Sequence, residues 1–135
     1  ADIRVTNSTI RNAGIGIKIS RSTYCLLKDT KIYNVTQDGL HIESSQYCVI
    51  DGAQIFNLDD GVSDGDPQGG TWNKHPDAIQ VQIYGASRDK LRPNRFVVIR
   101  NSRLYFAEGQ ALQFNNYQQT GNGINNSDFV IENNL

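Results

Sequence analysis

Short runs in which apolar and polar residues alternate recur along this chain. Residues 17–20 read IKIS, and residues 40–43, which lie 23 positions further on, read LHIE. A period of two places every second side chain on the same face of a strand, so each run has one apolar face. The pattern therefore predicts short strands that each bury one side.

The apolar positions repeat along the chain and form three columns, with longer gaps where insertions occur. The first column contains Val5, Leu27, Ile50, Ile99 and Ile131, the second contains Ile10, Ile32, Ile55 and Leu104, and the third contains Ile17, Leu40, Ile79 and Leu112. Each residue of the third column has an apolar partner two positions later. Three columns per repeat predict a solenoid with three strands in every turn.

The spacing excludes other solenoids and favours a parallel β-helix. Helix-pair repeats are longer, at about 33 to 47 residues, and the chain lacks the regular leucines and recurring asparagine of leucine-rich repeats. Asp38-Gly39-Leu40-His41-Ile42 and the later Ile55-Phe56-Asn57 resemble the repeats of the pectate-lyase-like superfamily. This resemblance implies an all-β fold, a right-handed parallel β-helix of about five coils with three strands each.

Length and charge narrow the class of protein. A chain of 135 residues fits one domain, so we expect residues 1–135 to form a single parallel β-helix domain. The 13 Lys and Arg residues nearly balance the 14 Asp and Glu residues, which leaves no basic field for nucleic acid or an anionic membrane. No stretch approaches the roughly 18 consecutive apolar residues of a membrane span. We therefore expect neither nucleic acid nor a membrane as a partner.

Both ends of the sequence fall inside predicted coils, without capping elements. The chain begins at Ala1 and stops at Leu135. A bare coil end exposes core residues and unpaired strand edges. We expect residues 1–135 to be a fragment of a longer chain, with further chain or identical subunits covering the open coil ends.

Equivalent residues of stacked coils should form ladders, because neighbouring coils lie about 4.8 Å apart. Asn12, Asn34 and Asn57 share one turn position, where an amide can bond its neighbours and tolerate left-handed backbone. Cys25 and Cys48 share a column with apolar residues, so we expect them to point inward. We interpret them as packed thiols, but their expected separation also allows a disulfide, so their redox state stays open.

Three insertions interrupt the repeat, around residues 59–77, 84–95 and 117–127. Insertions in a solenoid cost the core little and concentrate where function needs a wall or a lid. All three border the third strand of the coil. We therefore expect the outer face of that strand to form the floor of a cleft between walls.

The floor is expected to be polar. Its outward residues form two rows, Lys18, His41, Gln80 and Gln113 in one and Ser20, Glu43, Gln82 and Asn115 in the other. The walls add Trp72, His75, Tyr84, Arg88 and Tyr117. Donors and acceptors with little apolar area suit hydroxyl-rich ligands, and sugar rings commonly stack on aromatic rings. We expect a polysaccharide as partner, with Gln80, Gln82, Gln113, Asn115, Glu43, Arg88, Tyr84, Trp72 and Tyr117 as its contacts.

Four residues are candidates for catalysis, namely His75, Asp77, His41 and Lys18. His75 and Asp77 lie just before the floor strand, and Asp77 takes the place one coil above Asp38. Two stacked carboxylates repel each other, which raises one pKa unless a cation or a protonated His lies between them. The pair can then act as general acid or base, or can cap turns through hydrogen bonds to the backbone. For His41, ligand contact and an ordinary structural role are equally open.

The loop at residues 59–66 is acidic and contains two glycines. Asp60, Asp64 and Asp66 offer oxygen ligands that can wrap Ca²⁺ in a Gly-rich loop. The loop lacks the spacing and terminal Glu of an EF-hand loop, so a solvated acidic loop is the favoured interpretation and calcium binding the alternative.

The resemblance to the pectate-lyase-like superfamily implies two kinds of function. Polysaccharide lyases and uronate epimerases need a base near C5, a charge that neutralises the uronate carboxylate and a proton donor. These roles would fall to His75 or His41, to Lys18 or Arg88, and to Tyr84 or Tyr117. The signature motifs of mannuronan epimerases and polygalacturonases are absent from the sequence. A non-catalytic β-helix, as in phage tailspikes and virion fibres, is the alternative, and both imply a location outside the cell or on a virion surface.

Overall fold

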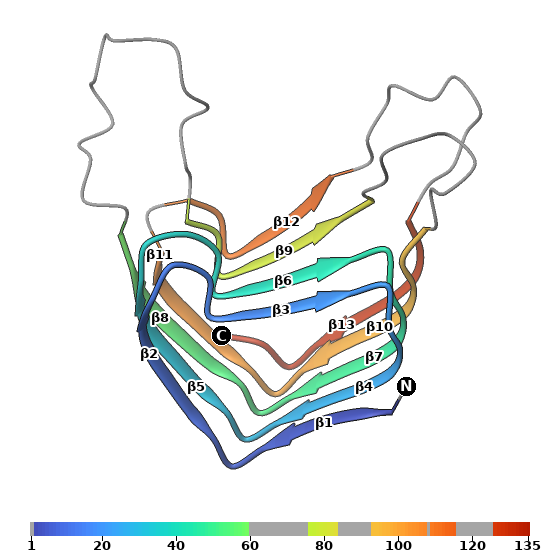
Figure 1. Ribbon diagram of the computed structural model, residues 1–135, viewed down its shortest axis with the longest axis horizontal. Coiled ribbons are helices and arrows are strands. Elements are labelled where there is room, and N and C mark those ends of the chain that lie inside the picture. The colour runs from blue at the N-terminus through green and yellow to red at the C-terminus, as the bar shows by residue number, and fades with distance from the viewer. Residues whose placement is uncertain (1, 60–75, 84–92, 108, 116–125) are drawn as a thin grey trace, which may run out of the picture.

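The computed structural model describes residues 2–59, 76–83, 93–107, 109–115 and 126–135. Every regular element in these ranges is a β-strand, and the strands form three parallel sheets (Figure 1). Sheet A contains β1 (Ile3–Thr6), β4 (Thr23–Lys28), β7 (Gln46–Asp51), β10 (Arg95–Arg100) and β13 (Ser127–Glu132). Sheet B contains β2 (Thr9–Ala13), β5 (Lys31–Val35), β8 (Gln54–Leu58) and β11 (Arg103–Ala107). Sheet C contains β3 (Ile17–Ser20), β6 (Leu40–Glu43), β9 (Ile79–Gln82) and β12 (Leu112–Asn115).

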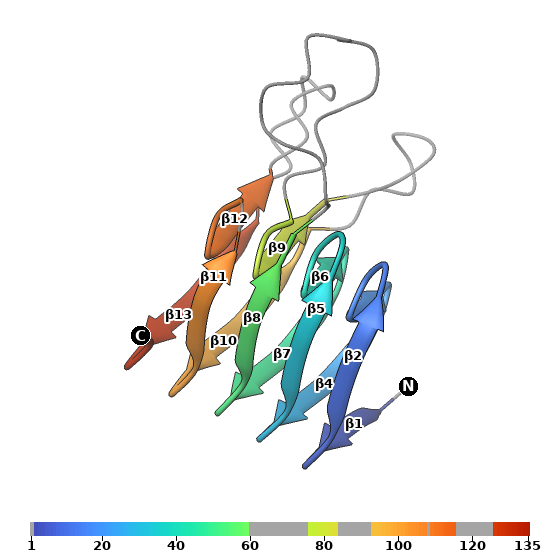
Figure 2. The same ribbon diagram turned by 90° about the vertical axis from the view of Figure 1, so that its left-hand side faces the viewer.

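The chain passes through sheets A, B and C in turn, and each round adds one coil. Figure 2 shows successive strands of the same sheet lying side by side along the stack. This arrangement confirms the expected all-β parallel β-helix, with β13 opening a further coil after the twelve strands that precede it in the described ranges. No helix in the described ranges is long and apolar enough to cross a membrane.

Neighbouring strands pair in the register that the apolar columns predict. In sheet C, Leu40 pairs with Ile17 and with Ile79, and Ile79 pairs with Leu112. The column of Val5 continues through Leu27, Ile50, Ile99 and Ile131, and that of Ile10 continues through Ile32, Ile55 and Leu104. The chain thus returns to the same register after each of the three insertions.

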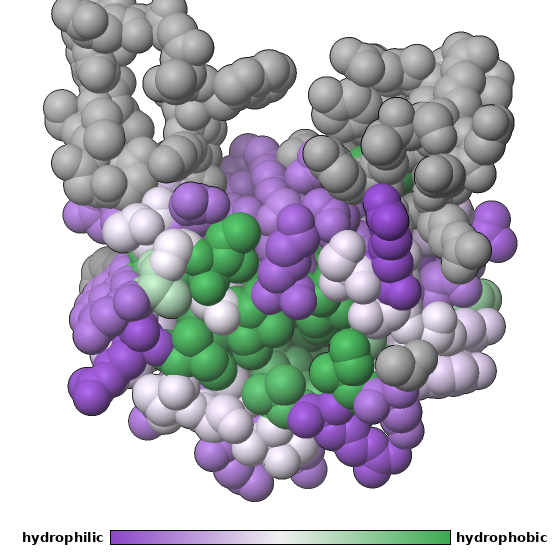
Figure 3. Space-filling view, viewed as in Figure 1, coloured by the Kyte–Doolittle hydropathy of each residue, from purple (hydrophilic) through white to green (hydrophobic). Residues whose placement is uncertain are grey.

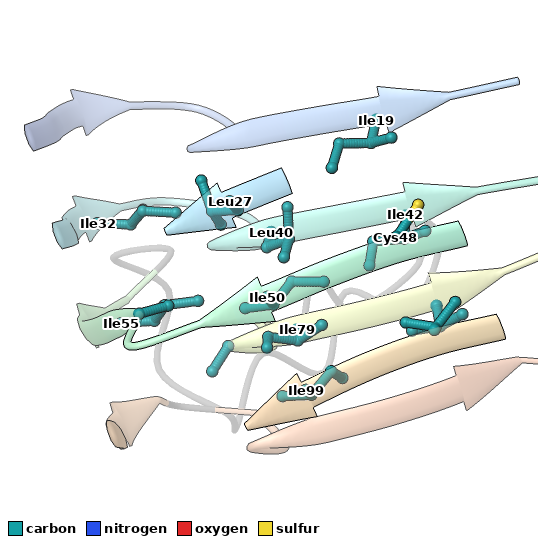
Figure 4. Packing of buried hydrophobic residues seen from close by; sticks show 14 of the residues in the cluster. Ile19, Leu27, Ile32, Leu40, Ile42, Cys48, Ile50, Ile55, Ile79 and Ile99 are labelled. Carbon is teal, nitrogen blue, oxygen red and sulfur yellow. The ribbon is translucent and has the colours of Figure 1, made fainter. Parts of the chain in front are cut away.

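The inward side chains of the three sheets pack into a common core. Leu40, Ile42 and Ile79 are fully buried, and Figure 4 shows them filling the space between the strands together with residues of the other sheets. Figure 3 shows hydrophobic residues gathered in the centre of one face and hydrophilic residues around them. Full burial of such a side chain contributes about 1.5–3 kcal/mol to folding, so the core is the main source of stability.

Left-handed backbone recurs at equivalent places in successive coils. The turn from sheet A to sheet B places Asn7, Asp29, Gly52, Asn101 and Asn133 at φ values between 49° and 72°. Asn12, Asn34 and Asn57 lie within sheet B at φ values of 53° to 55°. The side-chain amide of Asn34 donates a hydrogen bond to Asn12 Oδ1 at 3.4 Å. The expected left-handed asparagine position is therefore confirmed, and so is the amide ladder for this pair.

Polar side chains at the corners bond backbone groups that lie earlier in the chain, mostly in the preceding coil. Ser45 N donates to Asn94 Oδ1 at 2.7 Å, and the Asn94 amide donates to Gln82 O at 2.8 Å. At the corner between sheets A and B, Ala53 N donates to Ser102 Oγ at 3.2 Å. These bonds satisfy buried backbone groups at places where the chain leaves one sheet for the next.

Two ladders of aromatic rings run across the coils on the outer faces of sheets A and B. One contains Tyr24, Tyr47 and Phe96, and the other contains Tyr33, Phe56 and Tyr105. Neighbouring ring centroids lie 4.7–5.1 Å apart, with interplanar angles of 4° to 18°. Because neighbouring rings cover each other's faces, these two surfaces offer mainly ring edges to solvent.

Cys25 and Cys48 are register partners in β4 and β7 and are both free thiols. They are 4% and 0% exposed, which confirms that they point inward. Burial, with the neighbouring Cys25 thiol, raises the pKa of Cys48 far above its ordinary value. The structure therefore agrees with packed thiols rather than with a disulfide.

The coils approach most closely at the entrance to sheet C. A Cβ atom added to Gly39 would lie 2.4 Å from Ile55 Cγ2 and 2.8 Å from Ala78 O. Both separations are shorter than an ordinary van der Waals contact, so only glycine fits without a shift of its neighbours. This close approach brings the strand that carries His41 and Glu43 into its position in sheet C.

Candidate ligand-binding site

The outer face of sheet C carries the two polar rows that the sequence predicts, and we call these eight residues the floor. Lys18, His41, Gln80 and Gln113 are register partners in one row, and Ser20, Glu43, Gln82 and Asn115 are register partners in the other. His41 and Glu43 are only 8% and 6% exposed, although they lie opposite the core-facing residues of β6. The floor is thus partly buried rather than a fully solvated surface.

Glu43 is the centre of a charged cluster that joins the first two coils. Ser20 Oγ donates a hydrogen bond to Glu43 Oε2 at 2.7 Å. Lys18 Nζ lies 3.2 Å from Glu43 Oε1, and His41 Nε2 lies 3.9 Å from the same oxygen. The Glu43 carboxylate therefore lies next to a hydroxyl, an ammonium and an imidazole group, which come from two neighbouring strands.

These contacts decide the charge of Glu43. Burial by itself disfavours the ionised carboxylate, but the hydrogen bonds from Ser20 and Lys18 and the charges of Lys18 and His41 outweigh it. The net result is that the pKa of Glu43 lies below its ordinary value. Glu43 is therefore an anion at neutral pH.

His41 lies between two carboxyl groups. Its Nδ1 is 3.0 Å from Asp38 Oδ2, and both side chains are nearly buried. Within the described residues, neither ring nitrogen of His41 makes a hydrogen bond of good geometry. The ring therefore lies between Asp38 on one side and Glu43, 3.9 Å from Nε2, on the other.

Asp38 and Asp77 form a ladder at the entrance to sheet C. Asp77 N donates a hydrogen bond to Asp38 Oδ1 at 3.3 Å, and Gln110 N donates to Asp77 Oδ1 at 2.7 Å. Each carboxyl group therefore caps the turn of the next coil, which was one of the two alternatives open from the sequence. The catalytic role of Asp77 stays a prediction.

Amide groups continue the first row of the floor beyond His41. Gln80 Nε2 donates a hydrogen bond to Gln113 Oε1, and the Gln80 side chain is half-buried. Gln82 is half-buried as well. An amide both donates and accepts hydrogen bonds. The amides at this end of the floor can therefore replace the hydrogen bond between Gln80 and Gln113 with hydrogen bonds to a ligand.

A family model described as "Right handed beta helix region" matches residues 1–135. The chain belongs to this right-handed β-helix family. No curated protein and no solved structure matches it. The family establishes the handedness of this β-helix, whereas the pectate-lyase-like subtype stays a prediction.

Several predicted site residues of this β-helix lie outside the described residues. They are Trp72, His75, Tyr84, Arg88 and Tyr117 of the expected walls and Asp60, Asp64 and Asp66 of the possible calcium loop. The walls and the calcium site therefore stay predictions. In the ranges that the structure does describe, no three His, Cys, Asp or Glu side chains are grouped to hold a metal ion.

The sequence interpretation missed the part that Asp38 plays in the site. It treated Asp38 only as the carboxyl group below Asp77, whereas the structure places it against His41. The available signal was the separation of three residues between Asp38 and His41 within one coil. The register between coils does not predict such contacts, because they depend on the direction in which side chains of the turn before β6 point.

Proposed function

We propose that the floor of this β-helix binds a polysaccharide. The observation that carries the proposal is the repetition of hydrogen-bonding side chains in two rows, once per coil, along the outer face of sheet C. A polymer whose units repeat hydroxyl groups along its length matches such rows better than an isolated small molecule does.

The chemistry of the floor favours hydroxyl groups over other ligands. Lys18 and Gln80 can donate hydrogen bonds, while Glu43 and Gln113 can accept them. Neighbouring groups on the floor can therefore donate to the oxygen of a sugar hydroxyl and accept from its hydrogen. The outer residues of sheet C supply little apolar area for a lipid or a hydrophobic peptide. The near balance of 13 basic and 14 acidic residues disfavours nucleic acid.

The right-handed β-helix family agrees with a carbohydrate-related role and with a structural role. The bond between Gln80 and Gln113 is what a purely structural ladder would also contain. The two roles differ in what loss of these amides does to binding. A structural ladder predicts lower stability alone, whereas the proposal predicts lower affinity for a glycan as well.

A glycan array tests the proposal with wild-type protein and the double variant Gln80→Ala plus Gln113→Ala. Loss of buried hydrogen-bonding groups costs about 1–3 kcal/mol each, so we expect affinity to fall at least about tenfold. Gln54→Ala, which changes a glutamine of sheet B, serves as the control and should bind like wild type. Circular dichroism verifies that each variant is folded. Equal binding by the folded double variant and wild type would refute the proposal.

The pectate-lyase-like reactions are a second candidate, supported by the contact between His41 and Asp38. An aspartate next to an imidazole is a common arrangement for a general base. Elimination from a uronate polymer also needs a positive charge, and of its two predicted sources Lys18 already pairs with Glu43, while Arg88 lies outside the described residues. We therefore propose binding without elimination, in a protein located outside the cell or on a virion surface. Release of unsaturated uronate from alginate or pectate, seen by ultraviolet absorbance, would overturn this choice.

A further inference from the structure

The charges of the floor narrow the class of glycan. We infer that the polysaccharide bound by the floor carries no acidic groups, so that uronate, sulfate and phosphate polymers are excluded. This inference rests on the proposed function, and it follows from the way in which the described residues pair their charges.

The positive charge of Lys18 is already compensated. Its Nζ lies 3.2 Å from Glu43 Oε1, while Ser20 holds the other carboxylate oxygen at 2.7 Å. Glu43 is 6% exposed, so it cannot move into solvent and release Lys18 without leaving its hydrogen bonds. An acidic sugar would have to compete with a fixed anion for the same ammonium group.

His41 does not supply a spare positive charge either. Its ring nitrogens lie 3.0 Å from Asp38 and 3.9 Å from Glu43, so a protonated ring would have two carboxyl groups as partners. Asp77, one coil above Asp38, adds a further carboxyl group at the same edge of sheet C. Among the described residues of the floor and this edge, acidic groups therefore outnumber basic ones.

A partly buried surface of this charge discriminates between hydroxyl and acidic ligands. Electrostatic repulsion is screened less in a buried site than on an open surface, so a like charge placed beside Glu43 or Asp38 is strongly disfavoured. A hydroxyl group meets no such penalty, because it can donate to a carboxylate and accept from an amide or an ammonium group. The same pairing of charges that excludes acidic polymers thus leaves binding of hydroxyl groups intact.

The test compares pairs of polymers that share a backbone and differ in acidic groups, such as mannan with mannuronan and dextran with dextran sulfate. Affinity electrophoresis of wild-type protein at physiological ionic strength should show at least about tenfold tighter binding of the neutral member. Glu43→Gln removes the anion that compensates Lys18, so the ratio of neutral to acidic affinity should fall by about tenfold. Glu132→Gln makes the same change in net charge on an exposed residue of β13 in sheet A, and it should leave the ratio as in wild type.

The outcomes separate the two proposals. Tighter binding of the acidic members by wild-type protein would overturn this inference and leave polysaccharide binding in place. Failure to bind either member of any pair would count against the proposed function, and this inference would fall with it. An equal shift of the ratio in Glu43→Gln and Glu132→Gln would show that net charge, rather than the pairing of Lys18 with Glu43, sets the preference. The wild-type comparison does not depend on the folding of any variant.

Discussion

Replacement of Gly39 by alanine tests whether the close approach of coils at the entrance to sheet C sets the fold. The added methyl group would lie 2.4 Å from Ile55 Cγ2 and 2.8 Å from Ala78 O. Ile55 is fully buried, and its β-branched side chain has few alternative rotamers. Ala78 O accepts a hydrogen bond from Leu40 N at 2.9 Å, so the carbonyl cannot retreat without stretching a bond between coils.

The expected loss follows from these two contacts. Overpacking of a well-packed site destabilises the folded state by about 1–3 kcal/mol. Replacement of glycine by alanine also restricts the unfolded chain, which stabilises the folded state by about 0.4–1 kcal/mol. A net decrease of about 1–2 kcal/mol in the free energy of unfolding is therefore expected. With an m value of about 2 kcal/mol per molar urea, the unfolding midpoint should fall by about 0.5–1 M.

Urea unfolding followed by circular dichroism measures this shift, and Gly14→Ala is the matched control. The nearest atom to a Cβ on Gly14 is Gln37 Nε2 at 3.9 Å, which is an ordinary contact. Gly14→Ala should therefore keep or slightly raise the midpoint. Equal midpoints for the two variants would show that the close approach of the coils does not limit the side chain at position 39.

Two further predictions concern the buried thiols and the charged cluster. In native protein at neutral pH, Cys25 and Cys48 should both resist a thiol reagent, because they are buried and the pKa of Cys48 is raised. Both thiols should react once the protein is unfolded in denaturant. Rapid labelling of either thiol in native protein would contradict this prediction. The pKa of Glu43 is lowered in the native state, so its contribution to stability is complete above its ordinary pKa and is lost as pH falls through the lowered native value. In that acidic range, the free energy of unfolding should therefore fall less steeply with pH in Glu43→Gln than in wild type, whereas Glu132→Gln should behave like wild type. Parallel plots of the free energy of unfolding against pH for wild type and Glu43→Gln would argue against the cluster.

The strands and their register could be predicted because a solenoid repeats one pattern many times. The alternation around Leu40 and the spacing of 22 or 23 residues between Val5, Leu27 and Ile50 determine which residues stack. The insertions did not hide the register, since the apolar columns reappear after each of them. The two rows of the floor follow directly from this register.

Other features of the site depend on contacts that register does not report. The burial of His41 and Glu43, and the contact between His41 and Asp38, depend on the direction of side chains within one coil. The pairing of Lys18 with Glu43 joins diagonal rather than directly stacked positions. Sequence spacing gives the location of the floor, but the partners of its charges require coordinates.

The aromatic ladders of sheets A and B have an optical consequence. Closely stacked Tyr and Phe rings in a fixed chiral arrangement give rise to near-ultraviolet circular dichroism, which disappears when specific packing is lost. Tyr24, Tyr47 and Phe96 lie on sheet A and not on the floor of sheet C, so a ligand on the floor would not contact them. The molecule thus contains its own spectroscopic reporter of coil stacking, separate from the surface on which sugars are proposed to bind.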